Sequence, residues 1–250
     1  MIQAPVEYNV WYIIGVFIAN GVGCVLAVFA LVRMTDERRS VGNRAFLVVA
    51  AAWGLIETAR DDALFVLATA VHLRDDGVRF FLAPGLGLTV LAMLIAIAVL
   101  GIAAARPRPL WTITAGVTVG LLTGAMVVQS VLSARTGYAV SIDVPAAVAI
   151  AAGLAVVTSV SVFLATGTTV RWRMSVPIMV LAACMTAAQY LLAGQIRTDL
   201  SAIVDSEIGV GAIEVIFISA ATFFVRTLGL TVVSMTDEGR VDQPVSPDLF

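Results

Sequence analysis

Four ionisable residues lie close together inside an otherwise apolar run that is long enough to span a membrane. They are Glu57, Arg60, Asp61 and Asp62, and the residues on both sides of them are almost all apolar. On a helix, residues three and four apart are neighbours, so acids and an arginine at these spacings can pair. Such a cluster could bind an ion or a polar ligand, pass a proton, or hold helices together.

Helical geometry predicts how the cluster is arranged. Glu57 and Asp61 are four residues apart and stack on one face, and Arg60 can pair with Glu57. Asp62 points elsewhere, over Thr58. Three acids and one arginine sum to minus two when all are ionised, which is unfavourable in a medium of low dielectric constant. We expect this surplus to be relieved by protonation of one acid, by a second cation or by water.

The composition indicates the medium in which the cluster lies. The chain is 60% hydrophobic and only 13% charged, with a mean hydropathy of +1.00. Soluble domains are roughly 45–50% apolar and about 25% charged, so this chain is predicted to be an integral membrane protein. A charged side chain at the bilayer centre costs roughly 2.5–3.5 kcal/mol on insertion scales. The cluster is therefore expected to face protein, water or itself rather than lipid.

The elements that carry the cluster are predicted from the apolar runs. A transmembrane helix needs about 20 residues, and seven runs are long enough. They are expected near residues 10–33, 45–71, 80–104, 111–134, 143–167, 174–196 and 209–233. The predicted fold is all-α, a polytopic seven-helix transmembrane domain over residues 1–233, followed by a flexible cytoplasmic tail over residues 234–250.

The arginines predict the orientation, because short loops rich in positive charge stay in the cytoplasm. Ten arginines are assigned to one side of the membrane: Arg33, Arg38, Arg39, Arg44, Arg106, Arg108, Arg171, Arg173, Arg226 and Arg240. The other side is assigned only Arg74, Arg79, Arg135 and Arg197. This distribution places the N-terminus outside and the C-terminus in the cytoplasm.

Residue types that are scarce exclude several functions. The chain has no lysine, so it cannot form the Schiff base that a retinal protein needs. Its one histidine, His72, is expected at the outer end of the second span, where an interfacial position is favoured over metal binding. No serine, histidine and acid arrangement indicates a nucleophile, and no histidine pair indicates catalytic zinc. The sequence therefore predicts that the protein is not an enzyme.

Three of the expected spans can be aligned as internal repeats. In the second, fourth and sixth, Asp61, Val127 and Gln189 occupy equivalent positions in the outer third of each helix, and an arginine follows eight residues after two of them, at Arg135 and Arg197. The chain resembles the bacterial MHYT membrane domain. The resemblance rests on these spacings, on the run SIDVPAAVAIAAGLAVVTSVSVFLA and on the segment VEYNVWYIIGVFIANGVGCVLAVFALVR. That family has seven helices in helix-pair repeats, with a Met-His-Tyr-Thr signature on alternate spans.

The resemblance implies a bacterial inner-membrane sensor or signalling protein that binds copper through the signature histidines and methionines. Here Asp61, Val127 and Gln189 stand where the histidine would be, and none of them is an imidazole, thiolate or thioether donor that copper prefers. We therefore expect a degenerate MHYT-like bundle that has lost its copper site. No metal, retinal or other cofactor is expected.

Further polar residues at similar depth are expected to join the cluster around an outward-facing pocket. The predicted ligand or ion pocket consists of Glu57, Arg60, Asp61, Asp62, Gln189, Tyr190 and Glu214. A purely structural or partner-docking role for these residues remains open, as do ligand binding and a proton or ion path. The predicted function is a non-enzymatic membrane sensor or accessory subunit; the alternative is a small proton- or ion-coupled transporter or channel. Expected partners are the lipid bilayer and another membrane protein or a second copy of the chain, but no nucleic acid.

Overall fold

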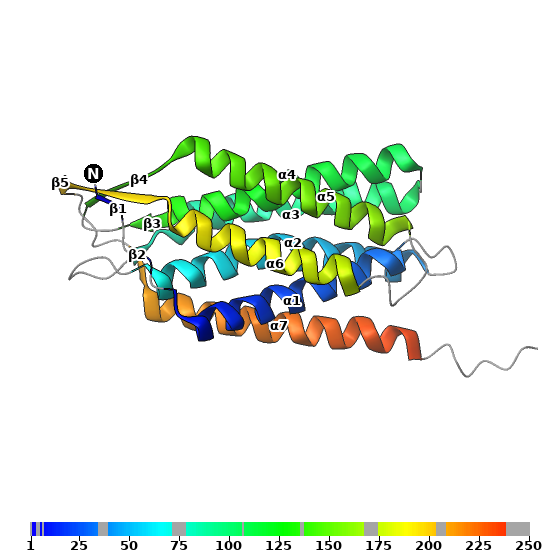
Figure 1. Cartoon of the computed structure of the whole chain (residues 1–250). Helices are drawn as coiled ribbons and strands as arrows, with labels where there is room; N and C mark the ends of the chain where they lie inside the picture. Colours follow the sequence, from blue (N-terminus) through cyan, green and yellow to red (C-terminus); the bar gives the residue numbers. More distant parts are fainter. Residues whose placement is uncertain are drawn as a thin grey trace, which may run out of the picture.

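The computed structural model describes residues 2–3, 6, 8–34, 40–71, 79–106, 108–135, 138–167, 175–203 and 209–238. These residues form seven helices that lie side by side along one direction (Figure 1). They are α1 (Val10–Met34), α2 (Val41–Ala70), α3 (Leu82–Ala105), α4 (Pro109–Ser133), α5 (Val144–Gly167), α6 (Ser175–Ala193) and α7 (Ala212–Glu238). Their bounds differ from those of the seven expected runs by only a few residues at each end.

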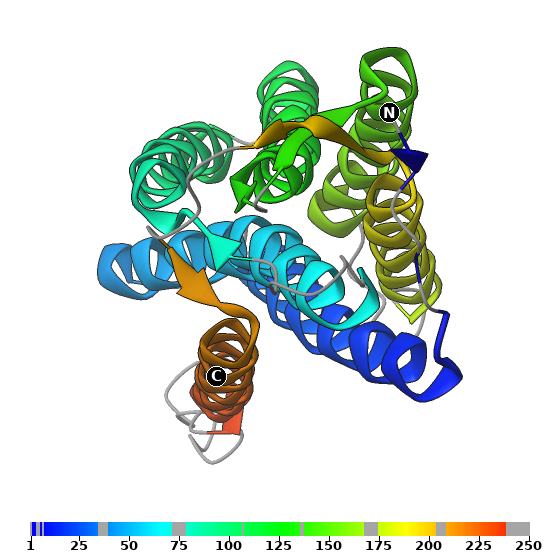
Figure 2. The same cartoon turned by 90° about the vertical axis from the view of Figure 1, so that its left-hand side faces the viewer.

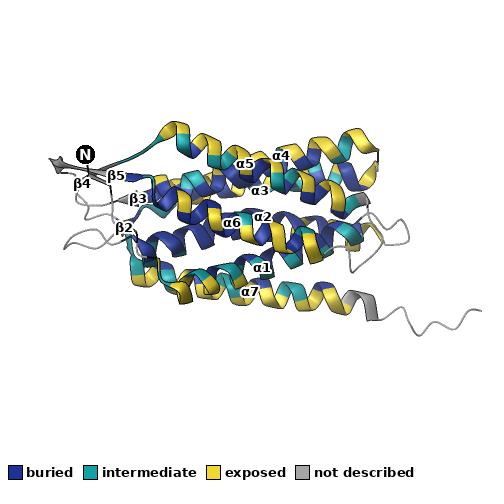
Figure 3. Ribbon diagram, in the orientation of Figure 1, coloured by how far each residue is buried: buried dark blue, intermediate teal, exposed yellow. Residues whose placement is uncertain are grey.

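All the described helices except α2 are long and apolar enough to cross a membrane, which makes six. Exposed residues lie along the outside of the bundle (Figure 3), and many of them are large and apolar. Leu94 is 60% exposed, Val156 63% and Phe217 71%. A soluble protein rarely exposes an apolar surface this continuous, whereas a lipid-facing surface requires one. The protein is a multi-pass helical membrane protein.

Helix α2 is the exception because it carries the four charges of the cluster, and it lies at the centre of the bundle. Its 30 residues span roughly 45 Å at 1.5 Å per residue. It packs against α1, α3, α4, α6 and α7, an arrangement that the end-on view in Figure 2 makes clear. Most of its residues from Leu47 to Ala70 are buried. The neighbouring helices thus shield the charges of α2 from lipid.

Two helix pairs approach each other closely at glycines. A Cβ atom at Gly54 of α2 would lie 2.7 Å from the Gly23 carbonyl oxygen of α1, and one at Gly120 of α4 would lie 2.3 Å from the Ala155 carbonyl oxygen of α5. Both distances are far below van der Waals contact with backbone atoms. Small residues at helix interfaces allow this close packing, which drives helix association in a bilayer.

The described residues form an all-helical bundle, as the sequence predicts, with short strands at one end of it. One sheet has the order β1 (Ile2–Gln3), β5 (Ile196–Ile203) and β4 (Tyr138–Ile142), and the other has the order β3 (Ala134–Arg135), β2 (Arg79–Phe80) and β6 (Val210–Gly211). All the pairings are antiparallel. The strands follow or precede helix ends at the same end of the bundle, where backbone groups that have left a helix need partners.

Helix α7 lies at the edge of the bundle and packs mainly against α1 and α2 (Figure 2). Only 17% of its most apolar 18-residue stretch is buried, the lowest share among the six apolar helices. The helix continues to Glu238, so residues 234–238 extend it rather than begin the tail that the sequence predicts. The rest of the predicted tail lies outside the described residues.

Candidate functional site

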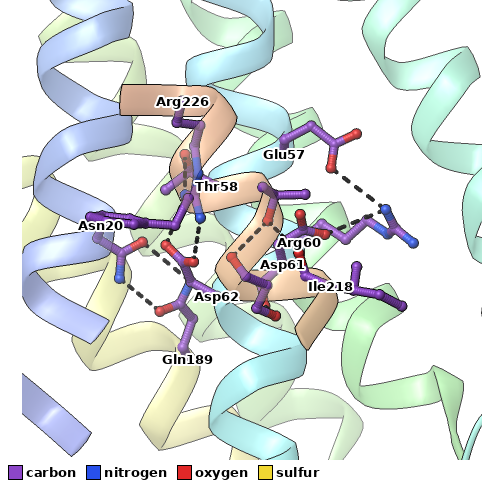
Figure 4. A network of polar contacts seen from close by, with 12 residues as sticks. Asn20, Glu57, Thr58, Arg60, Asp61, Asp62, Gln189, Ile218 and Arg226 are labelled. Atoms are coloured by element: carbon purple, nitrogen blue, oxygen red, sulfur yellow. Dashed lines mark hydrogen bonds and ion pairs between the residues drawn. The ribbon is translucent and has the colours of Figure 1, made fainter. Parts of the chain in front are cut away.

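A buried ion pair joins α7 to α2 in the middle of the bundle. The two terminal nitrogens of Arg226 lie 2.8 and 3.0 Å from the two carboxylate oxygens of Asp62, and Nη1 also donates to the Thr58 hydroxyl at 2.9 Å. Arg226 is 1% exposed and Asp62 is 3% exposed. A bidentate arginine and carboxylate pair combines charge with fixed geometry, which makes it one of the stronger side-chain contacts in proteins. Figure 4 shows the pair with its neighbours.

The position of Arg226 corrects its assignment to the cytoplasmic end of the last span. It lies well inside α7 and supplies the second cation that the acidic surplus of α2 requires. Three acids and two arginines then leave one negative charge in excess when all are ionised. Without Arg226, nine arginines instead of ten are assigned to the cytoplasmic side, against four on the other side, so the predicted orientation is unchanged. A sequence signal for this contact exists, because an arginine deep within an apolar run needs an acid on another helix.

The other charges of the cluster form a row along α2. Nη1 of Arg60 lies 3.5 Å from a carboxylate oxygen of Glu57 and 3.4 Å from Oδ1 of Asp61, so the expected pairing of Arg60 with Glu57 is confirmed. The row leads inward, because the Glu57 side chain is 21% exposed, that of Arg60 8% and that of Asp61 2%. Oδ2 of Asp61 is buried and has no hydrogen-bond partner among the described residues. Asp61 is therefore the least well paired of the buried acids.

Hydroxyl groups from two other helices bind the backbone of the charged segment. Ser130 of α4 donates to the Arg60 carbonyl oxygen at 3.1 Å, and Ser219 of α7 donates to the Asp61 carbonyl oxygen at 3.3 Å. Both serines are buried. These contacts fix the segment between α4 and α7, and neither serine was among the residues expected at the site.

A second polar group lies between α1 and α6. Nδ2 of Asn20 donates to the Gln189 side-chain oxygen and to the Thr186 hydroxyl, both at 2.9 Å, and Nε2 of Gln189 donates back to Asn20 at 3.4 Å. Figure 4 shows Asn20 and Gln189 on the side of α2 that carries Asp62. The predicted site residue Gln189 thus lies near the ionic cluster, whereas its partner Asn20 was not expected there. Reciprocal bonding satisfies two buried amides that would be costly alone.

Two of the expected site residues lie apart from the cluster. The Tyr190 ring packs against the Tyr8 ring at a centroid distance of 6.1 Å, and the Tyr190 hydroxyl has no hydrogen-bond partner among the residues described. Glu214 is exposed in the first turn of α7, with its carboxylate against Gly211. In the described part of the chain, neither residue makes a hydrogen bond or ion pair with the charges of α2.

The cavity beside the ion pair is mainly apolar. It has a volume of about 370 Å³ and lies between α1, α2 and α7. Asp62 and Ser219 are its polar lining residues, and the rest of the lining is apolar or glycine, including Val16, Phe65 and Phe223. This lining differs from the outward-facing polar pocket that the sequence predicts, because the charged groups bond to one another instead of surrounding the space.

The fold and the site together define a multi-pass helical membrane protein with a paired ionic core. Within the described ranges, no three His, Cys, Asp or Glu side chains are grouped as metal ligands would be, and His72 lies outside those ranges. No family model, curated protein or solved structure compared with the chain matches it.

Proposed function

We propose that the protein is a non-enzymatic membrane sensor or accessory subunit in which a buried ion pair fixes α7 to the other six helices. The bidentate contact between Asp62 and Arg226 carries this proposal. The two charges neutralise each other inside the bundle, as expected of an ion pair that holds helices together, and they do not line a polar passage. Removing one member of such a buried pair costs about 3–5 kcal/mol, so the position of α7 depends on it.

The surface of α7 supports a role in contacts with another membrane protein. Ile213, Phe217, Phe224 and Leu228 are all at least half exposed, and their spacing of four, seven and four residues places them on one face of the helix. This face has no partner within the described part of the chain. A second membrane helix, from another protein or another copy of the chain, would bury it.

The proposal includes seven spans, with the N-terminus outside and the C-terminus in the cytoplasm of a bacterial inner membrane. The central position of α2 supports its assignment as the seventh span, because its charges are screened from lipid. An MHYT-like origin is supported by the burial of Asp61, Val127 and Gln189, the three equivalent positions, each at most 1% exposed. In this proposal these three residues line the interior without holding copper.

Affinity purification in mild detergent, followed by mass spectrometry, tests the proposal. We expect a membrane protein to co-purify with the wild-type chain in near-stoichiometric amount, and its recovery to fall severalfold with Arg226→Gln. The matched control is Arg197→Gln, which removes an arginine from a more exposed pair with Asp143 and should leave recovery unchanged. Two results would contradict the proposal. One is purification of the chain as a solitary monomer, and the other is equal recovery of the partner with the wild type, Arg226→Gln and Arg197→Gln.

The row of Glu57, Arg60 and Asp61 favours a second candidate, a small proton- or ion-coupled carrier. The row runs from a partly exposed acid to a buried one, and one oxygen of the buried acid has no hydrogen-bond partner in the described part of the chain. Such an arrangement is able to accept a proton. Proteoliposomes that contain a pH-sensitive dye test this candidate. Proton flux in wild-type vesicles that is lost with Asp61→Asn and kept with Asp143→Asn would favour the carrier. Impermeable wild-type vesicles would exclude it.

A further inference from the structure

A second groove lies between α2 and α3 at the end of the bundle opposite the strands. Its volume is about 450 Å³, and it is lined by Val41, Arg44, Ala45, Val48 and Val49 of α2 and by Ile97, Gly101, Ala104 and Ala105 of α3. The lining is apolar except for Arg44. From Val41 to Val49 the groove follows α2 for roughly 12 Å at 1.5 Å per residue. The groove therefore suits a narrow apolar chain.

The polar end of this groove is positively charged. Arg44 lines the groove, and its Nε is buried without a hydrogen-bond partner. Arg106 and Arg108 follow the last lining residue of α3, are exposed, and form no side-chain ion pair within the described ranges. The first turns of α2 and α4, which begin at this end, contain no acid. Three arginines thus stand at one end of an apolar groove without a described carboxylate to neutralise them.

We propose that this groove binds an anionic phospholipid, with an acyl chain between α2 and α3 and the phosphate on Arg44. Arg106 and Arg108 would lie on the headgroup side. The chemistry fits because the ligand must be apolar along its length and anionic at one end, which a free phosphate is not. Basic pockets between transmembrane helices bind anionic headgroups in this way. A partner helix would fill the groove but would leave the arginine charges unpaired.

The lipid site is independent of the proposed role of Asp62 and Arg226, since it lies on other residues at one end of the bundle. Gly101 provides a direct test of the groove. A Cβ at this position meets no atom within 4 Å, so a leucine would project into the groove without a clash. Gly87, also on α3 and also without neighbours, lies outside the groove and supplies the matched control. Arg33 of α1 supplies a control for charge at the same end of the bundle.

The experiment is native mass spectrometry of the purified protein mixed with equal amounts of dioleoyl phosphatidylglycerol and dioleoyl phosphatidylcholine. We expect the wild-type protein to retain the anionic lipid in clear preference. Arg44→Gln should lower this preference about tenfold, the effect of losing a charged hydrogen bond of about 1.5 kcal/mol. Gly101→Leu should abolish retention of the lipid, whereas Gly87→Leu and Arg33→Gln should behave as the wild type does.

Three outcomes would overturn the proposal. They are equal retention of the two lipids by the wild type, unchanged retention with Gly101→Leu, and the same loss with Arg33→Gln as with Arg44→Gln. A further arm offers inorganic phosphate alone, and phosphate binding equal to that of the lipid would show that the acyl chain is not recognised. Gel filtration of each variant establishes that it is folded, so that lost binding is assigned to the groove.

Discussion

The two neighbouring acids of α2 differ sharply in their partners. Both carboxylate oxygens of Asp62 accept from Arg226. Asp61 instead has one long ion pair with Arg60, lies close to the Thr222 hydroxyl and the Glu57 carboxyl, and has one buried oxygen without a hydrogen-bond partner among the described residues. With three acids and two arginines, the cluster holds one negative charge too many. The charge of Asp62 is therefore required by the structure, and that of Asp61 adds to the excess.

This difference predicts opposite effects of the same substitution at adjacent positions. Asp62→Asn should lower the stability of the protein by several kcal/mol, because it leaves the buried Arg226 without a counter-charge. Asp61→Asn should be neutral or stabilising, because it removes the surplus charge. Thermal denaturation of the two variants in one detergent, followed by gel filtration, measures both effects. Equal losses of stability would show that the two acids have equivalent partners.

Part of this site could be predicted from the sequence. The pairing of Glu57 with Arg60 follows from their spacing on one helix, and the placement of Asp62 on the same face as Thr58, where both accept from Arg226, follows from the same geometry. Arg226 and Asn20 could not be placed, because their partners lie more than 160 residues away and depend on how α7 and α6 pack. Helix periodicity determines which residues share a face, but not which face of another helix it meets.

The helices themselves were predictable because each apolar run has the length that a bilayer requires. The strands were not, since most of them are only two residues long and β4 pairs with β5 across more than 50 residues of sequence. Between helices, the contact of α4 with α5 depends on small residues. Along α4, Gly116, Gly120 and Gly124 all lie against the backbone of α5.

Close packing of these two helices predicts a large effect at one glycine and none at another. Gly120→Leu should destabilise the bundle by about 1–3 kcal/mol or more, because even its Cβ would overlap the Ala155 carbonyl oxygen. Gly153→Leu on α5 should change little, since a Cβ atom there meets no atom within 4 Å. Comparison of their denaturation temperatures in detergent checks the prediction. A well-folded Gly120→Leu protein would show that the helices can separate at little cost.

On the scale of the whole molecule, the two ends of the bundle differ. The end with the strands carries the paired Arg197 and Asp143, and the opposite end carries the arginines beside the α2 and α3 groove. The arginine-rich end is the one expected in the cytoplasm. The predicted orientation and the proposed lipid site therefore agree, because both place the arginine-rich end of the bundle at the cytoplasmic face of the membrane.

Cysteine labelling in intact bacterial cells tests this orientation. Val144 at the strand end is 62% exposed and Val41 at the opposite end is 78% exposed. We expect a membrane-impermeant maleimide to label Val144→Cys directly and Val41→Cys only after the cells are permeabilised. The wild-type chain, whose Cys24 is buried and Cys184 half-buried, gives the background. The reverse pattern of labelling would invert the proposed orientation.

The central claim is that α7 is fixed to the bundle by the buried pair of Asp62 and Arg226. A double-mutant cycle with Asp62→Asn, Arg226→Met and the combined variant measures this coupling in the unfolding free energy. Each single substitution should cost about 3–5 kcal/mol, and the combined variant should cost much less than their sum, because neither charge is then left unpaired in the core. Strictly additive losses, or single losses below about 0.5 kcal/mol, the level of an ordinary surface substitution, would contradict the claim.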